Sequence, residues 1–272
     1  MDYLKTKKSL GQHWLYDPSA LSAMVELAEI KAGDEVVEVG PGLGTLTEYI
    51  LKTGANVTAV EFDQELYEKL TKQKPKLFGR YAVNLKLVSQ DILKFRFDQL
   101  PKGYKVAANI PYYLTSNLIR VLSETTNQPS SVTLLIQKEV AERLCAGPGD
   151  MSLLSIWAQV YFECSLGPVV PARLFTPPPK VDSQIVVMKL RSTPLFAGTD
   201  KKLLSQVIKA GFSNKRKTLH NSLSAGLQIS KDSAKEILEQ ANISVAARPQ
   251  ELSLVQWINL ANSWQSLRRM NN

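Results

Sequence analysis

Residues 109–113 read Asn-Ile-Pro-Tyr-Tyr and follow a short apolar run. A turn explains an Asn and a Pro at the end of a strand, but it does not explain two large rings there. The side-chain oxygen of Asn109 and the exposed carbonyl of Ile110 can accept hydrogen bonds from an amino group, and the ring of Tyr112 can stack on a planar group. The segment therefore indicates a site that holds a flat, amino-bearing ring in a fixed orientation.

A second segment of chemical interest is glycine-rich. Residues 37–50, "VEVGPGLGTLTEYI", read as a strand, a turn and the start of a helix. Gly40, Gly42 and Gly44 allow a tight turn and let the backbone approach a ligand closely. The segment predicts a nucleoside-binding loop, although a glycine turn without a ligand is an alternative.

Acidic residues follow the next two predicted strands. Glu61 closes the strand after the glycine loop, and Asp91 ends the one after that. A carboxylate in the position of Glu61 can accept hydrogen bonds from both hydroxyls of a ribose. Because the carboxyl ends of parallel strands meet at one edge of a sheet, we expect Glu61, Asp91 and Asn109 to line one crevice with the glycine loop.

Two cofactors fit this crevice on spacing alone. A nicotinamide dinucleotide also uses a glycine loop and a downstream acidic residue, but its loop normally reads GxGxxG, and here it reads GxGxG. S-adenosylmethionine has a ribose and an adenine but no phosphate, so it requires acceptors for hydroxyl groups and little positive charge.

The Asn-Ile-Pro-Tyr turn decides between the two cofactors. It resembles the turn of methyltransferases that act on planar amino nitrogens, in the variant found for N6 of adenosine. The lone pair of that nitrogen is delocalised into the ring, so the nitrogen is a poor nucleophile. Acceptors at Asn109 and Ile110 would favour a pyramidal nitrogen whose lone pair points at a sulfonium methyl group. The positive charge of the donor is neutralised during the transfer, so no metal is expected, and the base must leave its RNA stack.

The elements that position these residues follow from hydrophobic periodicity. We predict strands at 35–40, 55–61, 84–91, 104–109, 132–137 and 184–190, and helices near 17–30, 44–53, 63–72, 115–124, 138–146 and 151–163. Beyond residue 200 the segments 200–212 and 252–267 read as helices, with no strand pattern. Several strands are apolar on both faces, as in a parallel sheet covered by helices.

These patterns predict an α/β fold with two domains. Residues 1–195 would form a doubly wound, mostly parallel, seven-stranded methyltransferase sheet of the Rossmann-like kind, which binds S-adenosylmethionine. Residues 196–272 would form a small, all-helical domain, to which the family resemblance given below assigns RNA binding.

The composition is that of a globular protein, with 44% hydrophobic and 21% charged residues. No apolar run approaches the ~18 residues of a membrane span, and the N-terminal segment lacks the apolar run of a secretory signal. Cys145 and Cys164 do not form a close pair, so we expect two reduced cysteines, no zinc site and a cytoplasmic location.

Positive charge is concentrated near the C-terminus. The net charge is +8, and residues 201–231 contain seven basic residues and no acidic one. Such a cluster attracts phosphate backbones, although a solvated helical face is an equally simple reading.

Stretches along residues 5–265 together resemble the family of ribosomal RNA small-subunit adenine N6,N6-dimethyltransferases, the KsgA/RsmA family. They are "KKSLGQHWL" (7–15), "VEVGPGLGTLTE" (37–48), "NIPYYLTS" (109–116), "FTPPPKVDS" (175–183), "GFSNKRKTLHNSL" (211–223) and "RPQELSL" (248–254). The chain departs from the usual pattern at Trp14, where Phe is commoner, and at Tyr113, where Asn is often found.

The resemblance assigns roles to individual residues. It implies cofactor contacts from His13, Leu15, Gly40, Gly42, Glu61, Asp91 and Asn109. The same resemblance implies catalytic roles for Asn109 and Tyr112. In "FTPPPKVDS", three prolines fix an extended loop, which would present Phe175 as a second wall of the base pocket. Lys215, Arg216 and Lys217 would contact RNA phosphates, which gives affinity rather than base readout.

The function implied by the resemblance is specific. The enzyme would transfer two methyl groups from S-adenosylmethionine to N6 of each of two adjacent adenosines near the 3′ end of 16S ribosomal RNA, releasing S-adenosylhomocysteine. Its substrate would be the immature 30S subunit late in assembly, and the protein would act as a monomer.

Three other functions have to be weighed. The related macrolide-resistance enzymes methylate large-subunit RNA, but "FTPPPKVDS" and the basic segment argue against that group. An assembly factor could keep this fold without activity, but the intact Gly40, Glu61, Asp91, Asn109 and Tyr112 argue against that. A nicotinamide-dependent oxidoreductase gives no reason for the Asn-Ile-Pro-Tyr-Tyr segment.

Overall fold

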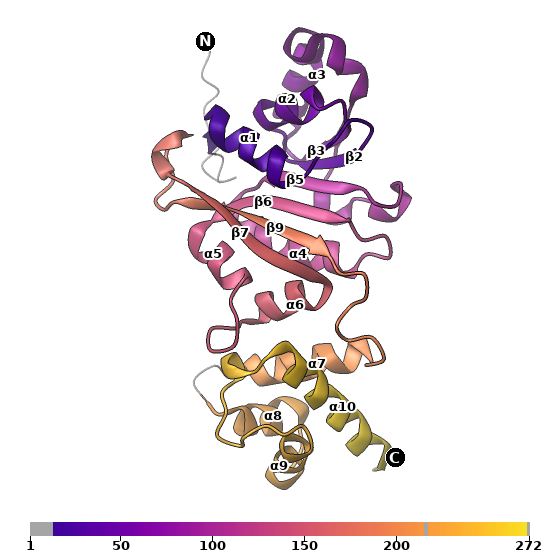
Figure 1. Cartoon of the computed structure of the whole chain (residues 1–272), viewed down its shortest axis with the longest axis vertical. Helices are drawn as coiled ribbons and strands as arrows, with labels where there is room; N and C mark the ends of the chain where they lie inside the picture. Colours follow the sequence, from indigo (N-terminus) through magenta and orange to yellow (C-terminus); the bar gives the residue numbers. More distant parts are fainter. Residues whose placement is uncertain (1–12, 215–216, 271–272) are drawn as a thin grey trace. The chain divides into compact units, whose positions relative to one another are not determined.

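The computed structural model describes residues 13–214 and 217–270. Its contacts divide the chain into two compact units (Figure 1). The first unit comprises Met1–Glu142 and Glu163–Leu190, and the second comprises Arg143–Phe162 and Arg191–Asn272. The sequence-based division at 195/196 differs in two respects, because residues 143–162 and residues 191–195 both group with the C-terminal helices and not with the sheet.

The first unit is built on a seven-stranded sheet with the strand order β4-β3-β2-β5-β6-β9-β7. Its strands are β2 (Glu35–Val39), β3 (Asn56–Glu61), β4 (Leu85–Ser89), β5 (Lys105–Asn109), β6 (Ser131–Gln137), β7 (Phe162–Val170) and β9 (Ser183–Leu190). Strands β2 to β6 pair in parallel, whereas β9 runs antiparallel to β6. The order reverses beside β2, which creates a crevice at the carboxyl ends of β2 and β5.

Helices cover both faces of this sheet. Figure 1 shows α1 (Pro18–Leu27), α2 (Thr45–Lys52) and α3 (Gln64–Phe78) on one side, and α4 (Thr115–Glu124) and α5 (Lys138–Leu144) on the other. The central strands are therefore apolar on both faces, with Val36, Val106 and Leu134 all buried.

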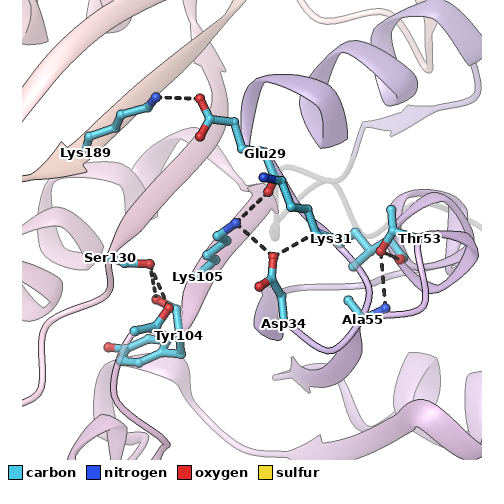
Figure 2. Close-up of polar contacts among 11 residues, drawn as sticks. Glu29, Lys31, Asp34, Thr53, Ala55, Tyr104, Lys105, Ser130 and Lys189 are labelled. Atoms are coloured by element: carbon cyan, nitrogen blue, oxygen red, sulfur yellow. Dashed lines mark hydrogen bonds and ion pairs between the residues drawn. The ribbon is translucent and has the colours of Figure 1, made fainter.

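A charged network holds the amino ends of the strands, opposite the crevice. Figure 2 shows Lys105 at the start of β5, whose Nζ donates to the carbonyl oxygen of Glu29 at 2.6 Å and to Oδ2 of Asp34 at 2.8 Å. Burial raises the pKa of Asp34, but hydrogen bonds from Lys105 and from the Lys31 N–H, together with the Lys105 charge, lower it further than burial raises it. Lys189 of β9 pairs with the side chain of Glu29 at 2.6 Å. The network fixes the strand whose other end carries Asn109.

The second unit is helical. It contains α6 (Leu153–Tyr161), α7 (Lys201–Phe212), α8 (Leu219–Leu227), α9 (Lys231–Gln240) and α10 (Leu254–Met270). Trp257 is fully buried, and its ring stacks on Phe212 with centroids 5.5 Å apart. Close packing explains the glycine at 211, because a Cβ atom there would lie 2.5 Å from the Trp257 ring.

The predicted fold class is confirmed, and the six predicted strands all occur. The seventh strand, β7, was not predicted, because Gly167 and Pro168 interrupt its apolar pattern. The prediction of a helix at 151–163 was right for α6 but ran slightly into β7. No helix in the described part of the chain is long and apolar enough to cross a membrane.

Candidate functional site

Two adjoining cavities lie at the carboxyl edge of the sheet and share Gly40, Glu61 and Pro111. Predicted residues that line the first cavity are His13, Leu15, Gly40, Gly42, Glu61, Asn109, Tyr112 and Phe175. Asp91 lines the second cavity. The structure therefore brings together every residue predicted to contact the cofactor or the target base.

The predicted RNA contacts are placed differently. Lys217 belongs to the second unit and is exposed, just before α8. Lys215 and Arg216 lie outside the described residues.

The glycine loop after β2 is shaped by three left-handed residues. Gly40, Gly42 and Gly44 have φ of +66°, +56° and +82°. A Cβ atom on Gly40 would meet nothing within 4 Å, whereas one on Gly42 would lie 2.4 Å from the ring of Trp14. The open space at Gly40 lets a ligand approach the backbone, and Gly42 makes room for Trp14 to cover the loop.

Glu61 is the buried carboxyl group at the junction of the two cavities. Its Oε2 accepts from the N–H of Gly42 at 3.1 Å, and its Oε1 accepts from the N–H of Asp63 at 2.9 Å. Burial raises the pKa of Glu61, while these two backbone hydrogen bonds oppose that rise. The hydrogen bonds tie the end of β3 to the glycine loop and fix the carboxyl group in the cavity wall.

Asp91 lies past the end of β4, in the wall of the second cavity. Its Oδ1 accepts from the N–H of Leu93 at 2.9 Å, which caps the short helix Ile92–Lys94. Two aromatic side chains of the same cavity, Phe62 and Tyr113, are 64% and 63% exposed. Sequence reasoning gave Phe62 no role, since a lone Phe beside an acidic residue carries no pattern.

Asn109 is the last residue of β5 and faces the first cavity. Within the described part of the chain, its side-chain amide makes no hydrogen bond, so its oxygen is available to an amino group. Tyr112 starts the turn Tyr112–Leu114, and its hydroxyl lies 3.1 Å from Oγ of Ser183. Burial raises the pKa of Tyr112, so the phenol is neutral near pH 7.

A two-stranded sheet closes the first cavity. Strand β1 (Trp14–Leu15) pairs antiparallel with β8 (Phe175–Thr176), and Leu15 lies opposite Phe175. Nδ1 of His13 donates to the carbonyl oxygen of Pro177 at 2.7 Å, and its ring stacks at 6.2 Å on Tyr112. Phe175 is buried and lines the same cavity as Tyr112, as expected for a second wall.

Glu38 is a cavity residue that sequence reasoning missed. It is 1% exposed and accepts from Oγ1 of Thr47 at 2.6 Å. Burial raises the pKa of Glu38 to about 8; the Thr47 hydrogen bond lowers it, and the charge of Glu61 raises it. The sequence did hold a signal for Glu38, because this residue lies inside the apolar predicted strand "EVVEVG". Burying a carboxyl group in a strand costs free energy, so its presence there indicates a function or a specific partner.

The chemistry of the two cavities selects among nucleoside cofactors. Their walls carry the four carboxyl groups of Glu38, Glu61, Asp63 and Asp91, but no Lys or Arg among the described residues. A pyrophosphate would find no cation among these described lining residues, whereas a sulfonium nucleoside finds acceptors for its hydroxyls. Across residues 13–214 and 217–270, no group of three His, Cys, Asp or Glu side chains could hold a metal ion.

A doubly wound sheet with this pair of cavities at its carboxyl edge defines an S-adenosylmethionine-dependent methyltransferase of the Rossmann-like class. The family model described as "Ribosomal RNA adenine dimethylase" matches residues 3–260. The chain belongs to this family.

Full-length relatives agree with this assignment. The chain is 40% identical over 260 residues to "Ribosomal RNA small subunit methyltransferase A" of Dehalococcoides mccartyi, covering 94% of this chain and 88% of the relative. It is 39% identical to the protein of the same description from Lactobacillus acidophilus, covering 96% and 92%.

Solved structures share the fold. A dimethyladenosine transferase from Plasmodium falciparum is 27% identical, with a TM-score of 0.78, covering 93% of this chain and 98% of that one. The 23S rRNA methyltransferase ErmE has a TM-score of 0.71 at 24% identity, covering 93% of this chain and 99% of that one, and this likeness concerns the fold alone.

Proposed function

We propose that this protein dimethylates N6 of two adjacent adenosines near the 3′ end of 16S ribosomal RNA, in the immature small subunit. The observation that carries the proposal is the free side-chain amide of Asn109 in the same cavity as Glu61 and Tyr112. The descriptions of its relatives name the small-subunit RNA as what those proteins methylate. The site of action would be the cytoplasm, where small subunits assemble, and the protein would act as a monomer.

The cofactor would be held by the walls of both cavities. Glu61 would accept hydrogen bonds from the two ribose hydroxyls, which reach a carboxyl already fixed by backbone N–H groups. Asp91 would accept a hydrogen bond from the amino group of the cofactor adenine through Oδ2, because Oδ1 accepts from the N–H of Leu93. His13, Leu15 and Gly42 line the part of the cavity left for the methionine portion. S-adenosylmethionine supplies an electrophilic methyl group.

The target adenine would be held by Asn109 and the aromatic walls. The amide oxygen of Asn109 and the carbonyl of Ile110 accept the two amino hydrogens, which orients the nitrogen lone pair toward the methyl group. Tyr112 stacks on the ring, and its hydroxyl is anchored near Ser183 so that the phenol cannot rotate freely. Phe175 provides a rigid apolar wall, because β8 is paired with β1. Stacking offsets part of the few kcal/mol that extracting a base from its stack costs.

RNA affinity would come in part from the second, helical unit. Lys217 is exposed, and together with Lys215 and Arg216 it would contact phosphates. Residues 1–195 would serve as the methyltransferase domain and residues 196–272 as the RNA-binding domain, with α6 packed in the helical unit.

The direct test is methyl transfer to small subunits from cells that lack this modification. With labelled S-adenosylmethionine, we expect about four methyl groups per subunit, two on each of two adenosines, recovered as dimethyladenosine. Transfer to large-subunit RNA instead would assign the protein to the resistance group. Tight binding of small subunits without transfer would make it an assembly factor.

A further inference from the structure

A second basic stretch lies in the first unit, far along the sequence from residues 201–231. Between residues 69 and 90 the chain has six basic residues and no acidic one: Lys69, Lys72, Lys74, Lys76, Arg80 and Lys86. They occupy the C-terminal part of α3, the short helix Gly79–Asn84 and the start of β4. We call these six residues the α3 basic surface.

The next feature of the α3 basic surface is how its cations are bonded within the described residues. In the described part of the chain none of the six forms an ion pair: Lys74 donates to the carbonyl oxygen of Leu85, and Arg80 donates to the hydroxyl of Tyr81 at 2.8 Å. Several basic residues elsewhere in this unit have acidic partners, although others, such as Lys94 and Lys102, form no ion pair among the described residues either. Arg96 pairs with Asp98 at 2.7 Å, and Lys189 pairs with Glu29 at 2.6 Å. What distinguishes the α3 basic surface is the run of six cations with no acidic residue among them, which favours an anionic partner.

Part of the surface is hollow. A cavity of about 310 Å³ is lined by Lys52 at the end of α2 and by Lys76, Arg80 and Tyr81. The guanidinium of Arg80 lies 4.9 Å from the centre of the Tyr81 ring, and this contact holds the group in one orientation. One N–H of the guanidinium donates to the Tyr81 hydroxyl, and the others can donate to a ligand. Lys52 is already paired with Glu48 at 2.7 Å, so Lys76 and Arg80 give this hollow its excess charge. The ammonium group of Lys76 and the guanidinium group of Arg80 border the same hollow, and such a pair of cations suits a phosphate group.

The surface is also positioned to act together with the methyl-transfer site. Helix α2 begins at Thr45 in the wall of the first cavity and ends at Lys52 in the wall of the hollow. The helix is about 12 Å long at 1.5 Å per residue, so the two sites are close to one another. The ring of Phe78 and the side chain of Leu70 pack against Gly44 of the glycine loop. An RNA whose base enters the first cavity therefore has room to run its backbone along this helix pair.

We propose that the α3 basic surface is a second phosphate-binding surface for the ribosomal RNA substrate, carried by the methyltransferase unit itself. The inference rests on the proposed function for the identity of the RNA. The contacts are made to the backbone, so they increase affinity without selecting sequence. Apolar side chains lie between the cations in the sequence, and Val83 among them is 84% exposed. The surface can therefore also make van der Waals contacts with the riboses of a bound RNA.

The test compares two double variants that each remove two positive charges from exposed positions of the first unit. Lys76→Ala with Arg80→Ala removes cations that form no ion pair among the described residues. Arg96→Ala with Lys138→Ala removes cations that already have acidic partners, since Lys138 pairs with Glu142 at 3.8 Å. Affinity for small subunits lacking the modification is measured across a series of KCl concentrations. Cofactor affinity, measured in parallel, reports whether each variant is folded.

We expect the first variant to bind about 10-fold more weakly at physiological salt, with the slope of log affinity against log salt reduced by about 1.4–1.8, since each lost phosphate contact removes about 0.7–0.9. The control variant should match the wild type. A charge reversal at two other positions of the surface, Lys72→Glu with Lys86→Glu, should give a larger loss. Equal slopes for the first variant and the control would overturn the proposal.

Two further readouts separate this proposal from others. Methyl transfer by the wild type in the same preparations tests the proposed function independently, because its absence would not alter the comparison of slopes. Vesicles that contain phosphatidylglycerol test an anionic membrane as the partner. Loss of vesicle binding in the first variant, with subunit binding unchanged, would also overturn an RNA role for this surface.

Discussion

The buried carboxyl group of Glu38 makes stability depend on pH, and replacing it by Gln should remove that dependence. Burial raises the pKa of Glu38 from 4.5 to about 8. Between these values the folded protein binds more protons than the unfolded chain, so folding stability falls as pH rises through this window. From pH 5.5 to pH 7.5 the loss from this one group is roughly 2–3 kcal/mol, at 1.36 kcal/mol for each unit of pKa shift.

Glu38→Gln retains an acceptor for the hydroxyl of Thr47 but has no proton to lose. The opening free energy of β2, measured by hydrogen exchange in the cofactor-free protein and corrected for intrinsic rates, should therefore fall less in the variant than in the wild type across this pH range, while Glu61, whose pKa is also raised, acts equally in both. The fall in the wild type should exceed the fall in the variant by roughly 2–3 kcal/mol. This local readout is preferable to a global melt, because the chain has two units that need not unfold together.

The matched control is Glu35→Gln, which removes the same charge from the same strand at a position that is not buried. It should leave the pH dependence of the wild type intact. The reasoning about Glu38 fails if its Gln variant loses stability between pH 5.5 and pH 7.5 as steeply as the wild type does.

Three further predictions concern the cavities. Glu61→Ala should weaken S-adenosylmethionine binding by more than about 100-fold in calorimetry, because hydrogen bonds to a charged group are worth about 1.5–3 kcal/mol each; near-normal affinity would disprove the ribose assignment. Asn109→Ala should retain RNA binding but lower the rate of methyl transfer below about a tenth of normal, and a higher rate would show that another residue orients the amine. Gly42→Ala should weaken cofactor binding, since its φ of +56° is strained and its Cβ would collide with Trp14. Gly103→Ala, with φ of +82° and open space, is the control, and equal binding by the two variants would contradict this account.

The fold was predictable because each strand–helix repeat carries its own periodic pattern. The central strands β2, β5 and β6 are apolar on both faces, and capping residues mark several helix starts, such as Asp63 before α3. Strand β7 lacks such a pattern, and the pairing of β1 with β8 joins segments 160 residues apart, for which local sequence has no signal. Contacts of that kind are decided by the tertiary structure.

The site was predictable to the extent that its residues end strands. Glu61 and Asn109 were found because the carboxyl ends of parallel strands converge, and the structure places both in one cavity. Glu38 was missed because it points into the cavity from inside a strand and not from its end. The α3 basic surface was missed because only the structure shows that its charges form no ion pair with another described residue and that two of them border a cavity.

The short β1–β8 pairing has a consequence for biosynthesis. One wall of the methyl-transfer cavity comes from His13 and Leu15, and another comes from Phe175, so the cavity is enclosed by segments made early and late in translation. A nascent chain that has completed β2 to β6 already holds the glycine loop, Glu61 and Asn109, yet it lacks Phe175 and the strand that anchors residues 14–15. The enzyme therefore gains its closed cavity only after residue 176 has left the ribosome that is making it, and shorter nascent chains have no enclosed place for a target base.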